Sequence, residues 1–359
     1  MKINFNLRLY KNIYIFFVFL SLFIFFFSTA KVEAKAFKID NIEITKPFEI
    51  NFDKNIVIDA GFKKAFSELI SLIVDSENQK KINLIRLNQI KGMIESFSIK
   101  EEKFINEIYF VKLDVSFNKK KVFEFLEKKN IFPSIPTKKK ILFIPIIINE
   151  KDKDLLIFSN NKIYDKWNIN NERHHLIEYI LPTADLEDLN TIKDKFDSIE
   201  NYDFKEISKK YFLNDSIIAL IFKNQKELRI LSRITIKDNI NLKNQTFSNI
   251  DLNNEQKIQK VIDELKTIYE DYWKNSNLIN TSIKLILKIK VKNLDNQKIS
   301  NFDKILNKND LIYDFFISKI DKDYIYYQVT FNGTPNMFLK SMSEDDYSFN
   351  TQNKIWILQ

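Results

Sequence analysis

The 359-residue sequence predicts an α+β fold built from successive small modules. Three patterns indicate this fold class. Apolar and polar residues alternate over 109–117 and 283–291, as they do in strands with one buried face. The nearly all-apolar run ILFIPIII at 141–148 is typical of a strand covered on both faces. Apolar residues recur every three to five positions over 60–73 and 254–273, as in amphipathic helices.

Residues 37–132 are expected to form a helix-on-sheet N-terminal domain. Two of its three helical patterns are clear, and the strand at 109–117 needs such helices to cover its apolar side. The elements expected are, in order, a strand, helices over 60–73 and 87–97, strands that include 109–117, and a helix over 122–126. Gly61 would precede the first helix, and Gly92 falls inside the second helical pattern without an evident reason.

Residues 140–253 are expected to form a small α/β domain with a mixed sheet, which follows a linker at 133–139. Pro133 and Pro136 interrupt the preceding pattern and indicate that linker. Strands alternate with helices at first and then continue as an antiparallel meander. The expected elements are strands over 141–148 and 176–181, helices over 186–196 and 204–212, and strands over 216–222, 228–236 and 240–247.

A connector helix over 254–277 would lead into a C-terminal ferredoxin-like domain at 278–359. The pattern there reads β-α-β-β-α-β, in which two helices cover one face of the sheet and leave the other face open. Its expected elements are strands over 283–291, 311–317, 325–331 and 355–358, with helices over 299–306 and 338–342.

The first 36 residues have the pattern of an export signal. Lys2, Arg8 and Lys11 form a positive start, and the run 13–28 carries no charge. Small residues then follow at alternate positions, as in a cleavage site. We therefore expect a signal peptide at 1–36, with a retained inner-membrane anchor as the alternative, in which case residues 13–30 contact the membrane. The rest of the chain would be exported to the periplasm.

The scarce residues exclude several kinds of site. The sequence has 3 Gly, 2 His and no Cys. No glycine-rich phosphate loop, disulfide, cysteine nucleophile or cysteine-ligated metal can be assembled from it. We expect no cofactor, no metal and no catalytic residue, and therefore a protein that is not an enzyme.

The net charge is modest once the export signal is removed. It is +8 for the whole chain, and loss of four basic residues and one acidic residue before position 35 leaves +5. Nucleic-acid binding draws on clustered Lys and Arg, which so small an excess does not supply. We expect no nucleic-acid partner.

One group of residues admits two interpretations. His174 and His175 lie just before a predicted strand, and Asp185 follows it. A histidine with a carboxylate partner could act as an acid–base pair in a periplasmic hydrolase. In the other interpretation Asp185 is a helix N-cap, and Glu187 and Asp188 lie in the first helical turn, where the helix dipole favours acidic side chains.

The open face of the last sheet is the candidate docking face. Lysines alternate with apolar residues in its first strand, and aromatic residues occur in the next two. The residues expected on this face are Lys284, Ile286, Lys288, Phe316 and Tyr326. Exposed apolar residues bordered by charges fit a protein partner. We therefore expect an envelope protein, or a cell-wall component, as the partner.

Several segments carry a resemblance. They are GFKKAFSELI at 61–70, FIPIII at 143–148, Asp165-Lys166-Trp167, LPTADLED at 181–188 and FKEISKKYFLNDSIIALI at 204–221. With this module order, the chain resembles an exported proteobacterial family known only as a domain of unknown function. The last segment also resembles the N-terminal domain of TolB and the middle domain of the flagellar assembly protein FlgT. The resemblance implies an envelope location and an assembly or binding role, and it supplies no catalytic residues.

Overall fold

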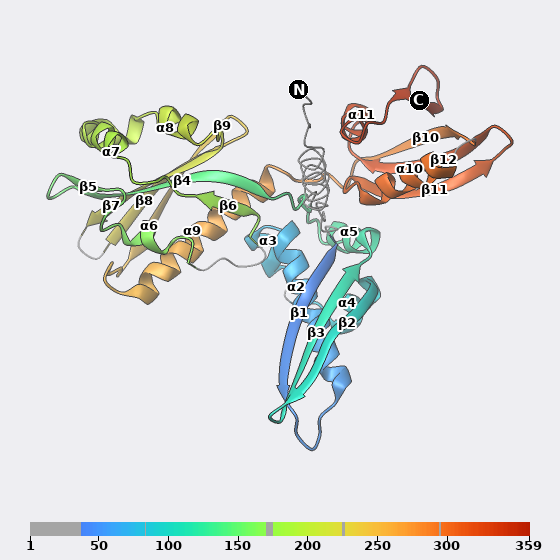
Figure 1. Ribbon diagram of the computed structural model, residues 1–359, viewed down its shortest axis with the longest axis horizontal. Helices are drawn as coiled ribbons and strands as arrows, with labels where there is room; N and C mark the ends of the chain where they lie inside the picture. Colours follow the sequence, from blue (N-terminus) through green and yellow to red (C-terminus); the bar gives the residue numbers. More distant parts are fainter. Residues whose placement is uncertain (1–36, 83, 170–174, 225–226, 294–295) are drawn as a thin grey trace, which may run out of the picture. The chain divides into compact units, whose positions relative to one another are not determined.

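The computed structural model describes residues 37–359 except 83, 170–174, 225–226 and 294–295 (Figure 1). The expected signal peptide and its alternative, the anchor at 13–30, lie outside the described residues. The described chain forms three sheets with helices packed on them, which confirms the α+β fold class.

The first sheet has the strand order β1-β3-β2, with antiparallel neighbours. Its central strand carries the alternation seen in the sequence, and Val111, Leu113 and Val115 are fully buried under α2, α4 and α5. The elements are β1 (Lys38–Pro47), α2 (Lys54–Ile73), α3 (Ser76–Lys80), α4 (Leu87–Met93), β2 (Ile94–Ile105), β3 (Ile108–Phe117) and α5 (Lys119–Glu127).

Two expectations for this part of the chain are wrong. The second helix ends at Met93, and Ile94 and Phe97 belong to β2, because pairing with β3 outweighs the short helical pattern. Gly61 lies inside α2 rather than before it, since Asp53 caps the helix eight residues earlier by accepting from Asn55 N.

The second sheet has the order β5-β4-β7-β8-β9, with β6 also paired to β4. The strand β4 runs parallel to β6 and β7 and antiparallel to β5, so the sheet is mixed, as predicted. Its elements are β4 (Lys139–Asn149), β5 (Asp154–Leu156), α6 (Lys162–Lys166), β6 (Ile177–Ile180), α7 (Leu186–Lys193), η1 (Phe196–Asn201), α8 (Lys205–Lys210), β7 (Ser216–Asn224), β8 (Glu227–Ile236) and β9 (Asn239–Ser248).

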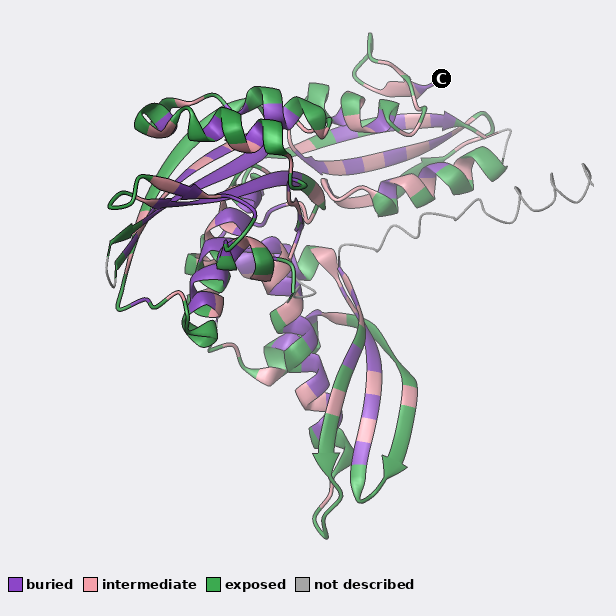
Figure 2. Ribbon diagram, turned by 60° about the vertical axis from the view of Figure 1, so that its left-hand side comes forward, coloured by how far each residue is buried: buried purple, intermediate pink, exposed green. Residues whose placement is uncertain are grey.

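Helices cover both faces of this sheet, which explains the continuous apolar run in β4. The helices α7 and α8 pack with η1 on one face, and α6 packs with α9 (Glu255–Asn275) on the other. Figure 2 shows the resulting buried layer along the strands. The helix expected as a connector therefore also contributes its apolar face, from Ile258 to Trp273, to this core.

The third sheet has the order β11-β12-β10-β14-β13. Its elements are β10 (Lys284–Lys292), α10 (Asn296–Lys308), β11 (Ile312–Ile320), β12 (Tyr324–Asn332), α11 (Pro335–Ser343), β13 (Phe349–Asn350) and β14 (Trp356–Leu358). The helices α10 and α11 bury Phe302, Leu306, Phe338 and Met342 on one face.

The ferredoxin-like detail of this sheet is not confirmed. A ferredoxin-like unit ends in one strand that returns directly from the second helix and runs antiparallel to the first strand. Here β13 and β14 form a hairpin, and β14 pairs parallel to β10. The hairpin reverses the chain once more before it reaches β10, so the last strand enters in the opposite direction.

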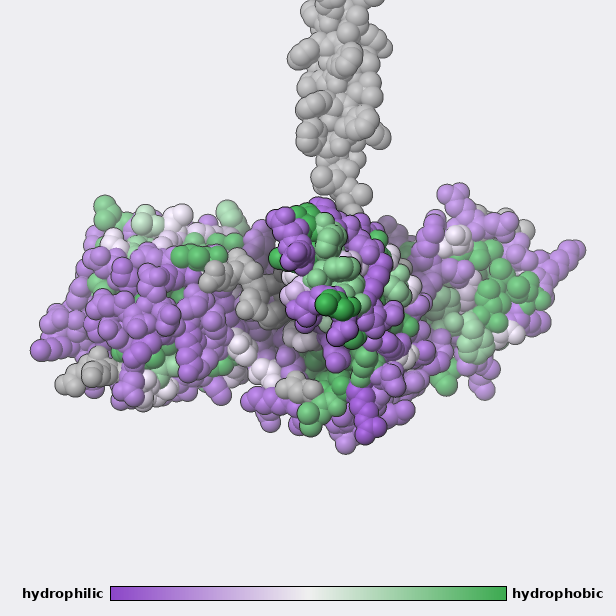
Figure 3. Space-filling view, turned by 90° about the horizontal axis from the view of Figure 1, so that it is seen from below, coloured by the Kyte–Doolittle hydropathy of each residue, from purple (hydrophilic) through white to green (hydrophobic). Residues whose placement is uncertain are grey.

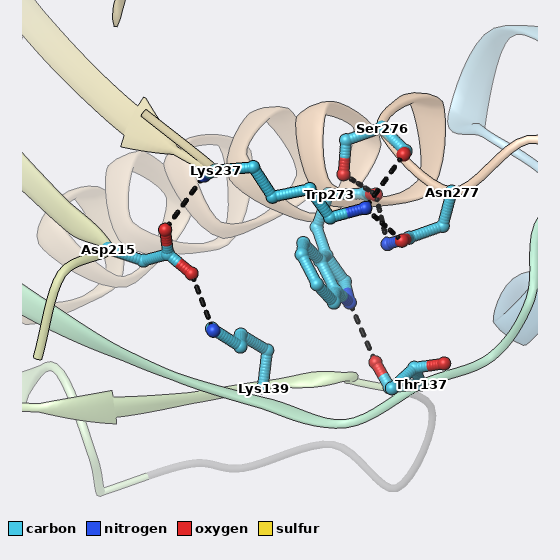
Figure 4. A network of polar contacts seen from close by, with 7 residues as sticks. All are labelled: Thr137, Lys139, Asp215, Lys237, Trp273, Ser276 and Asn277. Carbon is cyan, nitrogen blue, oxygen red and sulfur yellow. Dashed lines mark hydrogen bonds and ion pairs between the residues drawn. The ribbon is translucent and has the colours of Figure 1, made fainter. Parts of the chain in front are cut away.

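The C-terminal end of α9 is tied to the second sheet by a polar network (Figure 4). The Trp273 Nε1 donates to the Thr137 carbonyl at 2.7 Å, within the segment expected as a linker. The Lys237 ammonium lies 5.4 Å from the centre of the Trp273 ring. The buried Asp215 carboxylate accepts from Lys237 N at 2.8 Å and pairs with Lys139 Nζ at 2.6 Å. This network fixes the linker against the sheet.

Gly61 and Gly92 provide a matched pair of substitutions within the first sheet's helices. A Cβ at Gly61 would lie 2.4 Å from Leu113 Cδ1, whereas one at Gly92 would meet nothing within 4 Å. We expect Gly61→Ala to lower the free energy of unfolding by about 1–3 kcal/mol, because the fully buried Leu113 side chain must shift within a packed core. Gly92→Ala is expected to raise it by up to about 1 kcal/mol, because alanine favours helix. Urea denaturation measures both, and a Gly61→Ala protein at least as stable as Gly92→Ala contradicts the close packing.

Candidate docking face

The structure places all five predicted docking residues on one face of the third sheet. In the antiparallel register Lys288 and Phe316 flank Gln328, and Ile286 lies opposite Thr330. The intervening residues Leu287 and Val329 point to the other side, where α10 and α11 cover them. Because strand neighbours alternate between faces, the five residues share the side that the helices leave open.

Two large apolar side chains are accessible on this open face, one on each side of β12. The Ile286 side chain is 60% exposed and that of Phe316 is 50% exposed. Gln328 and Thr330 of β12 lie between them, and Lys288, two residues after Ile286 on β10, is also exposed. Large apolar side chains exposed on a sheet face that its own helices leave open are typical of interaction sites.

Tyr326 forms the partly buried side of the face. The Lys319 ammonium lies 5.1 Å from the centre of its ring. A hydrogen bond to the Asp321 carboxylate, with a smaller contribution from burial, raises the pKa of the Tyr326 hydroxyl. The hydroxyl is therefore a neutral donor at physiological pH.

Lys284 is on this face but is already bound to another part of the chain. Its Nζ pairs with Glu127 of α5 at 3.0 Å and lies 4.5 Å from the centre of the Tyr313 ring. The Tyr313 hydroxyl in turn donates to Glu124 of the same helix at 2.9 Å. Lys284 therefore positions the sheet against α5 and is the least available of the five for a partner.

A second lysine strengthens this joint between α5 and the third sheet. The Lys119 Nζ donates to the Asn309 carbonyl at 2.7 Å, just after the last residue of α10, where a cation is favoured. Burial lowers the pKa of Lys119 to about 8, although the nearby Asp310 carboxylate acts in the opposite direction. Lys120 adds an ion pair to Asp314 at 2.6 Å.

Sequence reasoning missed part of the positive charge on the face. Lys290 and Lys292 continue the alternation of β10 and share the side of Lys288. The Lys290 ammonium lies 4.5 Å from the centre of the Tyr324 ring. Both lysines follow the alternation of β10, so the same alternation predicts that they share the face of Lys288.

The helix-cap interpretation of Asp185 is confirmed. Its carboxylate accepts from Glu187 N at 2.8 Å at the start of α7 and lies 3.5 Å from Lys210 Nζ. The hydrogen bond from the Glu187 backbone, helped by Lys210, lowers the pKa of Asp185. His175 lies just before β6, and His174 lies outside the described residues. The hydrolase alternative stays a prediction.

Two features are absent from the described part of the chain. None of its groups of acidic residues and histidine has the arrangement to hold a metal ion. Among the helices that the structure describes, none is long and apolar enough to cross a membrane.

The fold and the open face define an α+β protein of three sheets with an accessible apolar patch on the last sheet. No protein-family model matches the chain, and no curated protein matches it.

The joint between α5 and the third sheet gives a pH prediction. The pKa of Lys119 is lowered on folding, so the folded state binds fewer protons, and stability rises with pH between about 8 and the unfolded value of 10.5. We expect Lys119 to raise the free energy of unfolding by about 2 kcal/mol between pH 7 and pH 9.5. Denaturation of wild type and Lys119→Met at both pH values measures this difference.

The exposed Lys128, one residue after α5, supplies the control. Its Lys128→Met variant should follow the pH dependence of wild type. If Lys119→Met follows it as well, the Lys119 ammonium is not desolvated in the joint.

Proposed function

We propose that this protein is a non-enzymatic exported envelope protein that binds a protein partner through the open face of the third sheet, in an assembly or scaffold role in the periplasm. The observation that carries the proposal is the exposure of Ile286 and Phe316, on two strands of the face that α10 and α11 leave open. Apolar side chains at the centre of such a patch supply most of the binding energy in protein interfaces.

The charge around this pair indicates the chemistry of the partner. Lys288, Lys290 and Lys292 line β10 on the open side, and Lys319 borders β11. Of the nearby acidic residues, Asp314 pairs with Lys120 and Asp321 with Lys319. The face is therefore positive at its border, and a partner with an apolar centre and acidic border fits it.

The attachment of the third sheet to α5 also supports a binding role. The ion pair of Lys284 with Glu127 and the hydrogen bond of Lys119 hold the third sheet against α5. A face held in a fixed orientation loses less entropy on binding than one on a mobile module. The export signal expected from the sequence and the resemblance to envelope proteins are consistent with this role.

The proposal is tested in cells with a photo-reactive residue at position 288. We expect a specific cross-link to one envelope protein, and we expect Ile286→Ser with Phe316→Ser to reduce its yield roughly tenfold, because two half-exposed apolar side chains lose their contacts. Both positions are exposed, so each substitution should change the free energy of unfolding by no more than about 0.5 kcal/mol.

Ile240→Ser is the matched control, because Ile240 is also 60% exposed but lies on β9 of the second sheet. It should leave the cross-link unchanged. A cross-link that survives the double variant, or that Ile240→Ser reduces equally, contradicts binding through this face.

A further inference from the structure

A second apolar surface lies at the end of the first sheet. It consists of five exposed large side chains, which we call the apolar tip: two in the turn after β1 and three at the strand ends beside the β2–β3 turn. They are Phe48 (50% exposed), Ile50 (104%), Phe104 (57%), Ile105 (58%) and Ile108 (47%). Figure 3 looks onto this end of the sheet and shows hydrophobic residues gathered there.

The apolar tip is an ordered part of the fold. Phe48 N donates to the Glu107 carbonyl at 2.8 Å and so ties the turn before α2 to the β2–β3 hairpin. The Phe48 ring packs against Phe104 and Phe52 with centroid distances of 4.6 and 4.8 Å. Both residues of the hairpin turn, Asn106 and Glu107, have positive φ, as a tight two-residue turn requires. The exposed side chains are therefore held outward by a fixed backbone.

The shape of the apolar tip favours binding to a surface that can deform around it. The side chains of the tip come from one turn and from the strand ends beside another, so the surface projects from the fold. The most exposed residue, Ile50, lies at the middle of the longer turn, between the end of β1 and the start of α2. A projecting apolar end is buried most readily by a surface that can close around it, which the interface of a lipid bilayer does.

The charge on the tip indicates which lipids fit. Segments 46–54 and 101–109 together carry three lysines and five carboxylates. Lys54 pairs with Glu102 at 2.7 Å, and Lys103 pairs with Glu101. Lys46 and the three carboxylates of Glu49, Asp53 and Glu107 remain, a net negative charge, so an anionic membrane surface would repel the tip. Zwitterionic headgroups present ammonium as well as phosphate, and they accept such a charge balance.

We propose that the apolar tip inserts into the interface of a zwitterionic lipid bilayer. Insertion buries the exposed side chains of Ile50 and of the two phenylalanines, and this apolar burial supplies the binding energy. Binding should therefore be insensitive to salt and should weaken as anionic lipid is added. This surface is separate from the open face of the third sheet, so the two proposals can fail independently.

The absence of cysteine from the sequence allows a local test in the full-length protein. A single Ile50→Cys substitution carries an environment-sensitive dye, and the vesicles contain phosphatidylcholine and phosphatidylethanolamine with nitroxide-labelled lipid. We expect lipid-borne nitroxide to quench the dye at position 50. The quenching should not decrease at about 0.5 M salt. A dye at Leu242→Cys, which replaces a 64% exposed residue of β9, should not be quenched.

A double variant and a change of lipid test the proposal further. Phe48→Ser with Phe104→Ser in the labelled protein should weaken vesicle binding at position 50 roughly tenfold, because each lost ring removes apolar burial. Replacement of the zwitterionic lipid by phosphatidylglycerol should weaken it as well. Equal quenching at positions 50 and 242, or binding to the anionic vesicles alone, overturns the proposal. A dye at position 50 that lipid does not quench but a protein in cells shields overturns it in favour of a protein partner.

Discussion

The last turns of α9 hold the first and second sheet modules together. Asp271 accepts from Ser76 N at 2.8 Å and from its hydroxyl at 2.5 Å, at the start of α3. Lys274 Nζ donates to the Val74 carbonyl at 3.3 Å, just after α2. On the other side of the helix, Glu270 accepts from the backbone of Ile177 at 2.8 Å, at the start of β6. One helix end therefore satisfies backbone groups of two sheet modules.

This arrangement costs free energy at the buried charges. Glu270 and Lys274 are only 3% and 4% exposed. Burial raises the pKa of Glu270 against the backbone hydrogen bonds that lower it, and burial lowers the pKa of Lys274. Both shifts show that the folded state disfavours the charged forms. Buried charged groups of this kind add little net stability, but a register that left them without partners would cost several kcal/mol. Their contribution is to select one arrangement of α9.

The sequence predicted those elements whose periodicity depends on burial alone. The alternation of β3 and β10 and the apolar face of α9 follow directly from which sides are covered. The strand β2 was missed because most of its residues are exposed, so it carries no alternation, and backbone pairing with β3 defines it. The hairpin of β13 and β14 was missed in part for the same reason, since two- and three-residue strands give no period.

The same distinction applies to the docking residues. Their common face could be predicted, because register and period fix which side chains share a side of a sheet. The contacts of Lys284 with Glu127 and Tyr313 could not be predicted. These two residues lie 157 and 29 positions away from it in the sequence, and only the tertiary fold brings them together. The apolar tip was missed too, because Phe48 lies in a turn and Phe104 lies in the exposed strand β2, and neither segment shows a period.

The joint and the open face impose opposite demands on β10. Its first lysine binds α5 and keeps the sheet in place, whereas Lys288 and Lys292 stay exposed. If Lys284 were free, the face would gain one charge but lose an attachment to α5, and the entropy saved by a fixed orientation would be lost on binding. The alternation of one strand thus serves two functions along its length, attachment at the start and exposure in the middle. The exposed part of β10 begins at Ile286, two residues after Lys284, and Phe316 is exposed on β11 of the same face.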